Sequence, residues 1–296
     1  MRIGIAGTGR MGSAIALRLM NVGHSVSVWN RSPEKTRPLS EAGATIQATP
    51  RELASASELI ITILTDAAAV EHTFGGEDGL LAGNVSGKLF VEMSTVRPEI
   101  EQRVAAQARD RGAAFVDCPV GGTVGPAREG KLLGFVGGQP ADVARAKPVL
   151  HQLCRRVEHV GPVGSGARMK LAINLPLLVY WQALGEALLI AKSLGLEPAR
   201  MMDILSDTSG GPNVLKARGP AIAAALRGDD VAPVTFDVDS IRKDLRTMIE
   251  EARSLGAALP VTQCALASFD DAARDGLGPK DASTLPARFV ARPPSS

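Results

Sequence analysis

The stretch that decides the fold is Arg2-Ile3-Gly4-Ile5-Ala6-Gly7-Thr8-Gly9-Arg10-Met11-Gly12. The apolar run Arg2–Ala6 predicts a buried strand, and an amphipathic pattern over Gly12–Asn21 predicts a helix directly after the glycines. In such a turn the first glycine permits the tight bend, the second lets a pyrophosphate approach the backbone, and the third lets the helix pack on the strand. Free N–H groups at the helix start then bind phosphate. We therefore predict a dinucleotide site, rather than a glycine-rich turn without a ligand, at Gly7, Thr8, Gly9, Arg10, Met11 and Gly12.

Short β-rich runs alternate with helical patterns through the first half of the chain. The expected strands are Arg2–Ala6, Ser25–Trp29, Leu59–Leu64, Leu89–Glu92, Ala114–Asp117 and Leu133–Val136. The expected helices are Gly12–Asn21, Pro33–Glu41, Arg51–Ala56 and Pro98–Arg111. Alternation of this kind builds βαβ units, so we predict an α/β fold with a doubly wound, Rossmann-type parallel sheet covered by helices on both faces.

The pattern changes near Gly161–Gly166, after which every segment is helical in type. We predict a nucleotide-binding domain over residues 1–163 and an all-α domain over residues 164–296 that serves the substrate and the subunit interface. One long helix, Gly166–Leu194, is expected to join the two domains, with a kink at Pro176 because proline removes a backbone donor.

The composition is that of a globular protein and excludes several other classes. Hydrophobic residues make up 45% and charged residues 22% of the 296 residues, and the net charge of +2 gives no sign of a nucleic-acid surface. The longest apolar stretch is not expected to span a membrane, because it is interrupted by Asn174, Pro176, Gln182 and Glu186. No signal peptide is visible, so a cytoplasmic protein is expected. The three cysteines Cys118, Cys154 and Cys264 form no metal-ligand pattern, so no metal is expected and all three are predicted to be buried thiols.

The end of the second expected strand indicates which nucleotide binds. NAD enzymes usually place a carboxylate there to accept from the ribose 2′-hydroxyl, but this chain has Trp29-Asn30-Arg31-Ser32, with Lys35 a turn later. A guanidinium can hold a 2′-phosphate with several donors. NADP(H) is therefore favoured over NAD(H), the alternative being that the charges are ordinary solvated ones. The residues expected to contact the cofactor here are Asn30, Arg31, Ser32 and Lys35.

Lys170 and Asn174 are the candidate catalytic pair, because four residues of helix place them on one face. A lysine and an amide on one face can both address a single substrate oxygen. Lysine can donate a proton when a carbonyl becomes an alcohol, and can accept it in reverse. A lysine on a helix is usually solvated, but its position directly after Gly161–Gly166 favours a catalytic role.

At this point the sequence resembles the β-hydroxyacid dehydrogenase family, which includes 3-hydroxyisobutyrate dehydrogenases and tartronate and other short-chain semialdehyde reductases. The resemblance extends to about Thr284 and rests on five motifs in order: Gly7–Gly12, Ser94-Thr95 with Pro98, Asp117–Gly125, Gly164–Asn174 and Lys243-Asp244. It implies hydride transfer between NADP(H) and a small β-hydroxy or ω-hydroxy acid and its semialdehyde or keto form. Lys170 would be the general acid and base, and Asn174 would orient the substrate oxygen.

The resemblance also implies roles for the remaining motifs. Leu64 and Thr65 would border the adenosine half of the cofactor, Ser94 and Thr95 would lie beside the nicotinamide ribose, and Lys243 would close over the cofactor.

The acid group of the substrate would be held by backbone N–H groups and a hydroxyl at Gly121, Gly122 and Thr123. Many family members have Ser-Gly-Gly at these positions, so Thr123 would replace the serine hydroxyl. Many relatives also have Asn where this chain has Ile173, and without a second polar group there oxidative decarboxylation is not expected.

Two other interpretations stay open. An imine reductase has a similar two-domain build, although such enzymes usually carry Asp or Tyr in place of Lys170. A non-catalytic nucleotide-binding module would keep the fold without needing Lys170 and Asn174. Apart from its small-molecule substrate, the chain is expected to pair only with its own copies, as a homodimer or homotetramer, since the long helix is apolar around much of its circumference.

Overall fold

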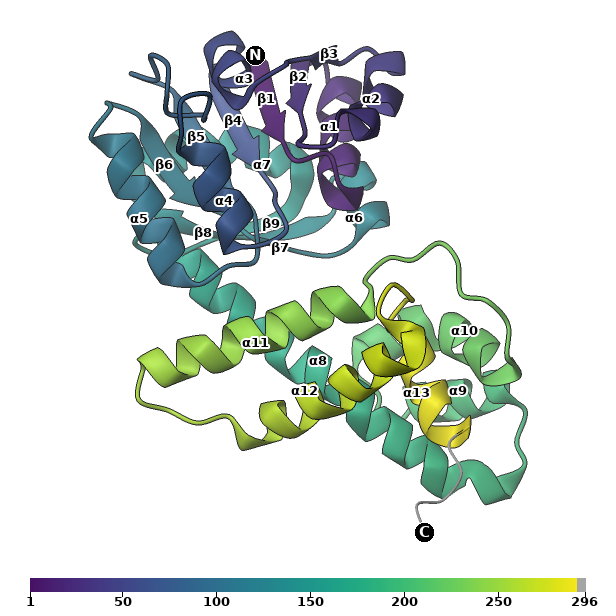
Figure 1. Cartoon of the computed structure of the whole chain (residues 1–296). Helices are drawn as coiled ribbons and strands as arrows, with labels where there is room; N and C mark the ends of the chain where they lie inside the picture. The colour runs from purple at the N-terminus through teal and green to yellow at the C-terminus, as the bar shows by residue number, and fades with distance from the viewer. Residues whose placement is uncertain (292–296) are drawn as a thin grey trace. The chain divides into compact units, whose positions relative to one another are not determined.

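The computed structural model describes residues 1–291, and its contacts divide the chain into two compact units, Met1–Leu171 and Ala172–Ser296 (Figure 1). Residues 292–296 of the predicted second domain lie outside the described residues. The division comes later than the expected boundary after Val163, because the first turns of the long helix α8 make their contacts with the first unit.

A sheet of nine strands, counted within residues 1–291, forms the centre of the first unit, in the order β3-β2-β1-β4-β5-β6-β8-β7 with β9 beside β8. The strands are β1 (Arg2–Ala6), β2 (Ser25–Trp29), β3 (Thr45–Ile46), β4 (Leu59–Thr62), β5 (Leu89–Glu92), β6 (Ala114–Asp117), β7 (Val120–Gly121), β8 (Leu132–Gly138) and β9 (Cys154–Gly161). From β3 to β6 all neighbours are parallel, so the doubly wound fold is confirmed and the turns after β1, β4, β5 and β6 meet at one edge.

The far side of the sheet departs from the predicted all-parallel arrangement. β8 runs antiparallel to both β6 and β7, and only its pairing with β9 is parallel. The hydrophobic pattern of the sequence predicted no strand at β3 or β7, because each has only two residues. It predicted none at β9 because the exposed residues Arg155 and Arg156 interrupt the apolar run.

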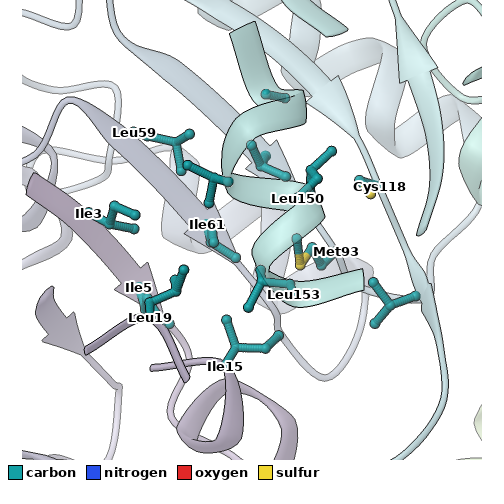
Figure 2. Close-up of a cluster of buried hydrophobic side chains, with 14 of the residues drawn as sticks. Ile3, Ile5, Ile15, Leu19, Leu59, Ile61, Met93, Cys118, Leu150 and Leu153 are labelled. Atoms are coloured by element: carbon teal, nitrogen blue, oxygen red, sulfur yellow. The ribbon is translucent and has the colours of Figure 1, made fainter. Parts of the chain in front are cut away.

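Helices cover the two faces of the sheet over separate apolar cores, because strand side chains alternate in direction. One core packs strand residues against α1 (Arg10–Asn21), α2 (Arg37–Glu41), α6 (Val124–Glu129) and α7 (Pro140–Leu153). Figure 2 shows part of it, with Ile3, Ile5, Ile15, Leu19, Leu59, Ile61, Met93, Cys118, Leu150 and Leu153 labelled. The other core packs Phe90 and Phe115 against α3 (Pro50–Ala56), α4 (Ala67–Phe74) and α5 (Pro98–Arg109).

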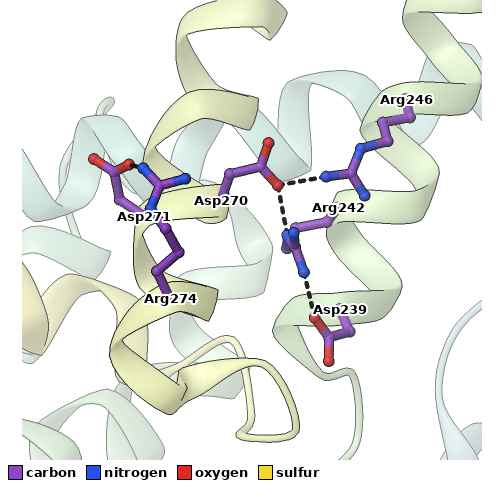
Figure 3. A network of polar contacts seen from close by, with 6 residues as sticks. All are labelled: Asp239, Arg242, Arg246, Asp270, Asp271 and Arg274. Atoms are coloured by element: carbon purple, nitrogen blue, oxygen red, sulfur yellow. Dashed lines mark hydrogen bonds and ion pairs between the residues drawn. The ribbon is translucent and has the colours of Figure 1, made fainter.

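The second unit is helical, as predicted. Its elements are α8 (Ser165–Ala191), which begins in the first unit, the 3-10 turn η2 (Lys192–Leu194), α9 (Pro198–Ser206), α10 (Asn213–Arg227), α11 (Val238–Ser254), α12 (Pro260–Ala272), the short helix η3 (Ala273–Leu277) and α13 (Thr284–Ala291). α8 continues through Pro176. Half-exposed ion pairs join α11 to α12, with Asp270 accepting from Arg242 at 2.6 Å and from Arg246 at 2.5 Å (Figure 3).

Among the described residues, one helix, Ser165–Leu194, is long and apolar enough to cross a membrane, with mean hydropathy 1.4. The same length and composition suit the core helix of a helical domain, and Leu178, Trp181 and Leu184 are buried within the fold. The prediction of three buried thiols was wrong for Cys264, which is exposed on α12, whereas Cys118 and Cys154 are buried.

Candidate active site

The glycine loop after β1 has the geometry that a bound pyrophosphate requires. Gly7 has φ +101°, and a Cβ added there would overlap the carbonyl oxygen of Ile63. A Cβ on Gly12 would overlap the carbonyl oxygen of Gly7, so this glycine lets α1 pack on β1. At Gly9, by contrast, a Cβ would meet no atom within 4 Å. The backbone at Gly9 is therefore open for a ligand to approach closely.

The N-terminus of α1 has the polarity that a phosphate needs. Gly9 is the N-cap, no side chain of residues 1–291 caps the helix, and its first turn carries no acidic residue. The positive end of α1 is thus not neutralised by a carboxylate. Asn30 is predicted to contact the cofactor, but its side chain also supports the loop, since Oδ1 accepts from Thr8 N–H at 3.0 Å and Nδ2 donates to the carbonyl oxygen of Ser32 at 2.9 Å.

Two cations lie beyond the end of β2, as the sequence suggested. Arg31 and Lys35 are exposed, and within the described part of the chain neither side chain forms a hydrogen bond or ion pair. Both belong to the segment that follows Asn30, whose side chain holds Thr8 of the glycine loop. The loop and the two cations are therefore neighbours at one edge of the sheet.

The turns after β4 and β5 are tied to each other at the same edge. Leu64 N–H donates to Ser94 Oγ at 2.8 Å, and Glu92 at the end of β5 accepts from Ser94 N–H at 2.9 Å. The neighbouring predicted cofactor residues are less enclosed: Thr65 is exposed and Thr95 is half-buried. The structure thus brings the predicted residues Leu64 and Ser94 into direct contact.

Asp117, at the end of β6, fixes the start of α8. Its Oδ1 accepts from Gly164 N–H and its Oδ2 from Ala167 N–H, both at 2.8 Å. The side chain is fully buried, and this burial is the main reason why the pKa of Asp117 is raised to about 7. The hydrogen bonds from Gly164 and Ala167 lower the pKa by a smaller amount, and the negative charge of Glu92 raises it slightly. A Cβ on Gly166 would lie 2.7 Å from Oδ2, so glycine is needed there for the carboxyl to reach the helix.

Lys170 lies one turn further along α8 and reaches the short strand β7, which follows β6 in the chain. Its Nζ donates to the carbonyl oxygen of Val120 at 2.8 Å. Val120 directly precedes the predicted acid-binding segment, in which Gly122 has φ +123° and is exposed. Thr123 is the N-cap residue of α6, but its side chain makes no cap hydrogen bond, and its hydroxyl has no hydrogen bond within residues 1–291. The ammonium and the predicted acid-binding groups are therefore close together in the first unit.

Asn174 and Lys243 belong to the second unit, where one carboxylate holds both. Asn174 Nδ2 donates to Asp244 Oδ2 at 3.3 Å, and Lys243 Nζ lies 2.5 Å from Asp244 Oδ1. Asn174 and Asp244 are buried, and Lys243 is half-buried. Asp244 was predicted only as part of the Lys243-Asp244 motif, without a role of its own.

Known protein families and curated relatives match this chain over nearly its whole length. Residues 2–161 match the family model described as the NAD binding domain of 6-phosphogluconate dehydrogenase, and residues 164–288 match that of the NAD-binding of NADP-dependent 3-hydroxyisobutyrate dehydrogenase. A 3-hydroxyisobutyrate dehydrogenase of Pseudomonas aeruginosa is 32% identical over 283 residues, which cover 93% of this chain and 95% of that protein. The chain belongs to the β-hydroxyacid dehydrogenase family.

Solved structures place this family member among two kinds of enzyme. The 3-hydroxyisobutyrate dehydrogenase of Mycobacterium tuberculosis, determined with L-serine, aligns with TM-score 0.85 at 25% identity, covering 98% of this chain and 99% of that one. A reductive aminase from Aspergillus terreus, determined with NADPH and ethyl levulinate, aligns with TM-score 0.64 at 26% identity, covering 97% of this chain and 99% of that one. This family member is thus an NAD(P)-binding oxidoreductase by fold and by family.

Some residues of the site were missed by sequence reasoning. Glu92 was predicted only as the end of a strand, two residues before the motif residue Ser94. Asp117 was predicted as a strand end and as the first residue of the Asp117–Gly125 motif, without a role of its own. Glu101 was not singled out, yet it lies three and four residues before the buried Val104 and Ala105, in the apolar stripe of α5. A carboxyl among the apolar positions of a helix is a signal that could have identified Glu101 as a buried acid.

Proposed function

We propose that this family member uses NADP(H) in preference to NAD(H) to interconvert a small β-hydroxy or ω-hydroxy acid and its semialdehyde. The observation that carries the proposal is the bond from Lys170 Nζ to Val120, because it holds an ammonium beside the segment Gly121–Thr123. A proton donor next to backbone N–H groups and a hydroxyl suits reduction of an aldehyde that carries an acid group.

Lys170 is the proposed general acid. When bound, a reduced nicotinamide would supply the hydride for the carbonyl carbon. Lys170 donates a proton from Nζ to the carbonyl oxygen in the same step, so that aldehyde, hydride and proton together give the alcohol. In the oxidative direction Lys170 accepts the hydroxyl proton. The carbonyl of Val120 orients the ammonium, and the Thr123 hydroxyl with the neighbouring N–H groups holds the acid group.

The cofactor preference is proposed from the free charges after β2. Arg31 and Lys35 are exposed and have no carboxylate partner among residues 1–291, so a 2′-phosphate would meet two cations. The roles of Asn174 and Lys243, the homodimer or homotetramer and the cytoplasmic location stay predictions.

Turnover by the purified protein tests the proposal. NADPH or NADH would be combined with glyoxylate, succinic semialdehyde or methylmalonate semialdehyde, and in parallel with uncharged aldehydes of matched length and a cyclic imine. We expect an acid to give the highest kcat/KM, with NADPH. Faster turnover of the imine than of every acid would favour the imine reductase interpretation, and NADPH binding without any turnover would favour a non-catalytic module.

A further inference from the structure

Glu92 is a buried acceptor that holds the turns after β4 and β5. Its side chain is fully buried and accepts from Thr62 Oγ1 at 3.3 Å, from Ser94 N–H at 2.9 Å and from the Ser94 hydroxyl. Ser94 Oγ in turn accepts from Leu64 N–H at 2.8 Å. Any change in the Glu92 carboxylate would therefore be transmitted to the two turns at this edge of the sheet.

A second carboxyl, that of Glu101 on α5, lies within hydrogen-bond reach of the Glu92 carboxyl. Glu101 is fully buried, and neither of its oxygens has a protein donor within hydrogen-bond distance among residues 1–291. The other ionisable group that acts on it is Asp117 of β6, which is also an acid, and no cation in the described chain pairs with Glu101. Burial, and then the charge of Glu92, raise the pKa of Glu101 well above its ordinary value.

The two carboxyls cannot both be ionised at low cost. Like charges in contact in an apolar site ionise one at a time, and the proton stays on the group with fewer donors. Glu92 has three donors and Glu101 has none. Glu92 is therefore the group that keeps the negative charge.

We propose that Glu101 is a positioning residue whose protonated carboxyl donates a hydrogen bond to the Glu92 carboxylate, and so fixes Ser94 and Leu64. In this arrangement the proton on Glu101 supplies the fourth hydrogen-bond donor to Glu92. A protonated acid, rather than a cation, is then the partner of the buried Glu92 carboxylate. The inference rests on the proposed function for one point, that these turns border the cofactor. The proton held between Glu101 and Glu92 does not depend on any activity.

The first test compares two substitutions of Glu101 in the full-length protein. Glu101→Gln keeps a neutral donor of the same shape and should bind NADPH within about twofold of the parent, whereas Glu101→Leu removes the donor and should weaken binding about tenfold, since a hydrogen bond to a charged group is lost. Glu99→Gln, two residues away and exposed, is the matched control. Equal NADPH affinity of Glu101→Leu and the parent would overturn the positioning role.

The second test detects the proton itself. A carboxyl with a raised pKa stabilises the fold most below its ordinary pKa of about 4.3, and this contribution is lost as the pH rises. Glutamine has no proton to lose, so the unfolding equilibrium constant of the parent should rise relative to Glu101→Gln by up to about tenfold per pH unit above that value. Infrared spectra edited by ¹³C labelling of glutamate alone, which separates Glu101 from the protonated Asp117, should show near pH 6 a protonated carboxyl stretch that Glu101→Gln lacks and Glu99→Gln retains. A pH-independent difference with no such band would overturn the shared proton, and absence of turnover with every substrate would contradict only the proposed function.

Discussion

Replacing Asp117 by Asn should change the pH dependence of stability. Asp117 is fully buried, and its pKa is raised to about 7, chiefly by burial. A carboxyl whose folded pKa is raised stabilises the fold fully below its unfolded pKa, and that contribution is lost as the pH rises through the folded value. With an unfolded value of about 3.9, the proton on Asp117 contributes about 3 kcal/mol at pH 5 and almost nothing at pH 9.

The substitution has an opposing cost that does not depend on pH. Asp117 accepts N–H bonds from Gly164 and Ala167, and an amide can accept only one of them because its NH₂ would face the other donor. The loss of a buried acceptor costs about 1–3 kcal/mol. Asp117→Asn should therefore be less stable than the parent at pH 5, and the deficit should shrink or reverse by pH 9.

Urea unfolding of both proteins from pH 5 to pH 9 measures this difference. We expect the difference in unfolding free energy between variant and parent to move by about 3 kcal/mol across the range, in favour of the variant at high pH. Asp110→Asn, exposed at the end of α5, should show no trend. A difference that stays constant from pH 5 to pH 9 would show that Asp117 keeps one charge state throughout and that its pKa is not raised into this range.

Three further substitutions test the cofactor and substrate assignments. Arg31→Asp should lower NADPH affinity at least about tenfold and favour NADH, since it removes a charge-assisted contact and adds a repulsive carboxylate. The control Arg109→Asp should leave NADPH affinity unchanged, and equal affinities of the parent for NADPH and NADH would contradict the assignment. Gly9→Val should fold, because a side chain there meets open space, yet it should bind NADPH at least about tenfold more weakly. Gly12→Ala should instead lower Tm through its clash with Gly7. NADPH binding by Gly9→Val at the parental affinity would show that no ligand approaches this loop. Thr123→Val should raise KM for acid substrates about tenfold and leave uncharged aldehydes unchanged, and a KM shift shared by both kinds of substrate would point to a packing defect instead.

Much of the first unit could be predicted because its signals are local. The strand–glycine–helix run at Gly7–Gly12 requires only neighbouring residues, and the missing carboxylate beside Arg31 is a single position. The parallel order from β1 to β6 follows from alternation and the handedness of βαβ crossovers. These features, with the helical second half, gave the fold class and the location of the nucleotide loop.

The parts that could not be predicted depend on contacts between distant residues. Asp117 meets Gly164 and Ala167 across a long separation in sequence, so no local pattern links them. The reversal of β8 depends on how the chain returns after α6 and not on its own composition. Glu101 looks like an ordinary acidic residue near a helix start, and only its burial against Glu92 gives it a role.

Lys170 is the proposed proton donor, and this role is tested by the single-turnover rate of Lys170→Ala, measured together with its NADPH affinity. We predict a rate lower by about 10²–10⁴-fold with NADPH affinity within about twofold of the parent, because the lysine acts on the substrate oxygen. Lys147→Ala, an exposed lysine of α7, should match the parent in both. Retention of more than about a tenth of the parent rate by Lys170→Ala would contradict the claim, since a general acid normally contributes more.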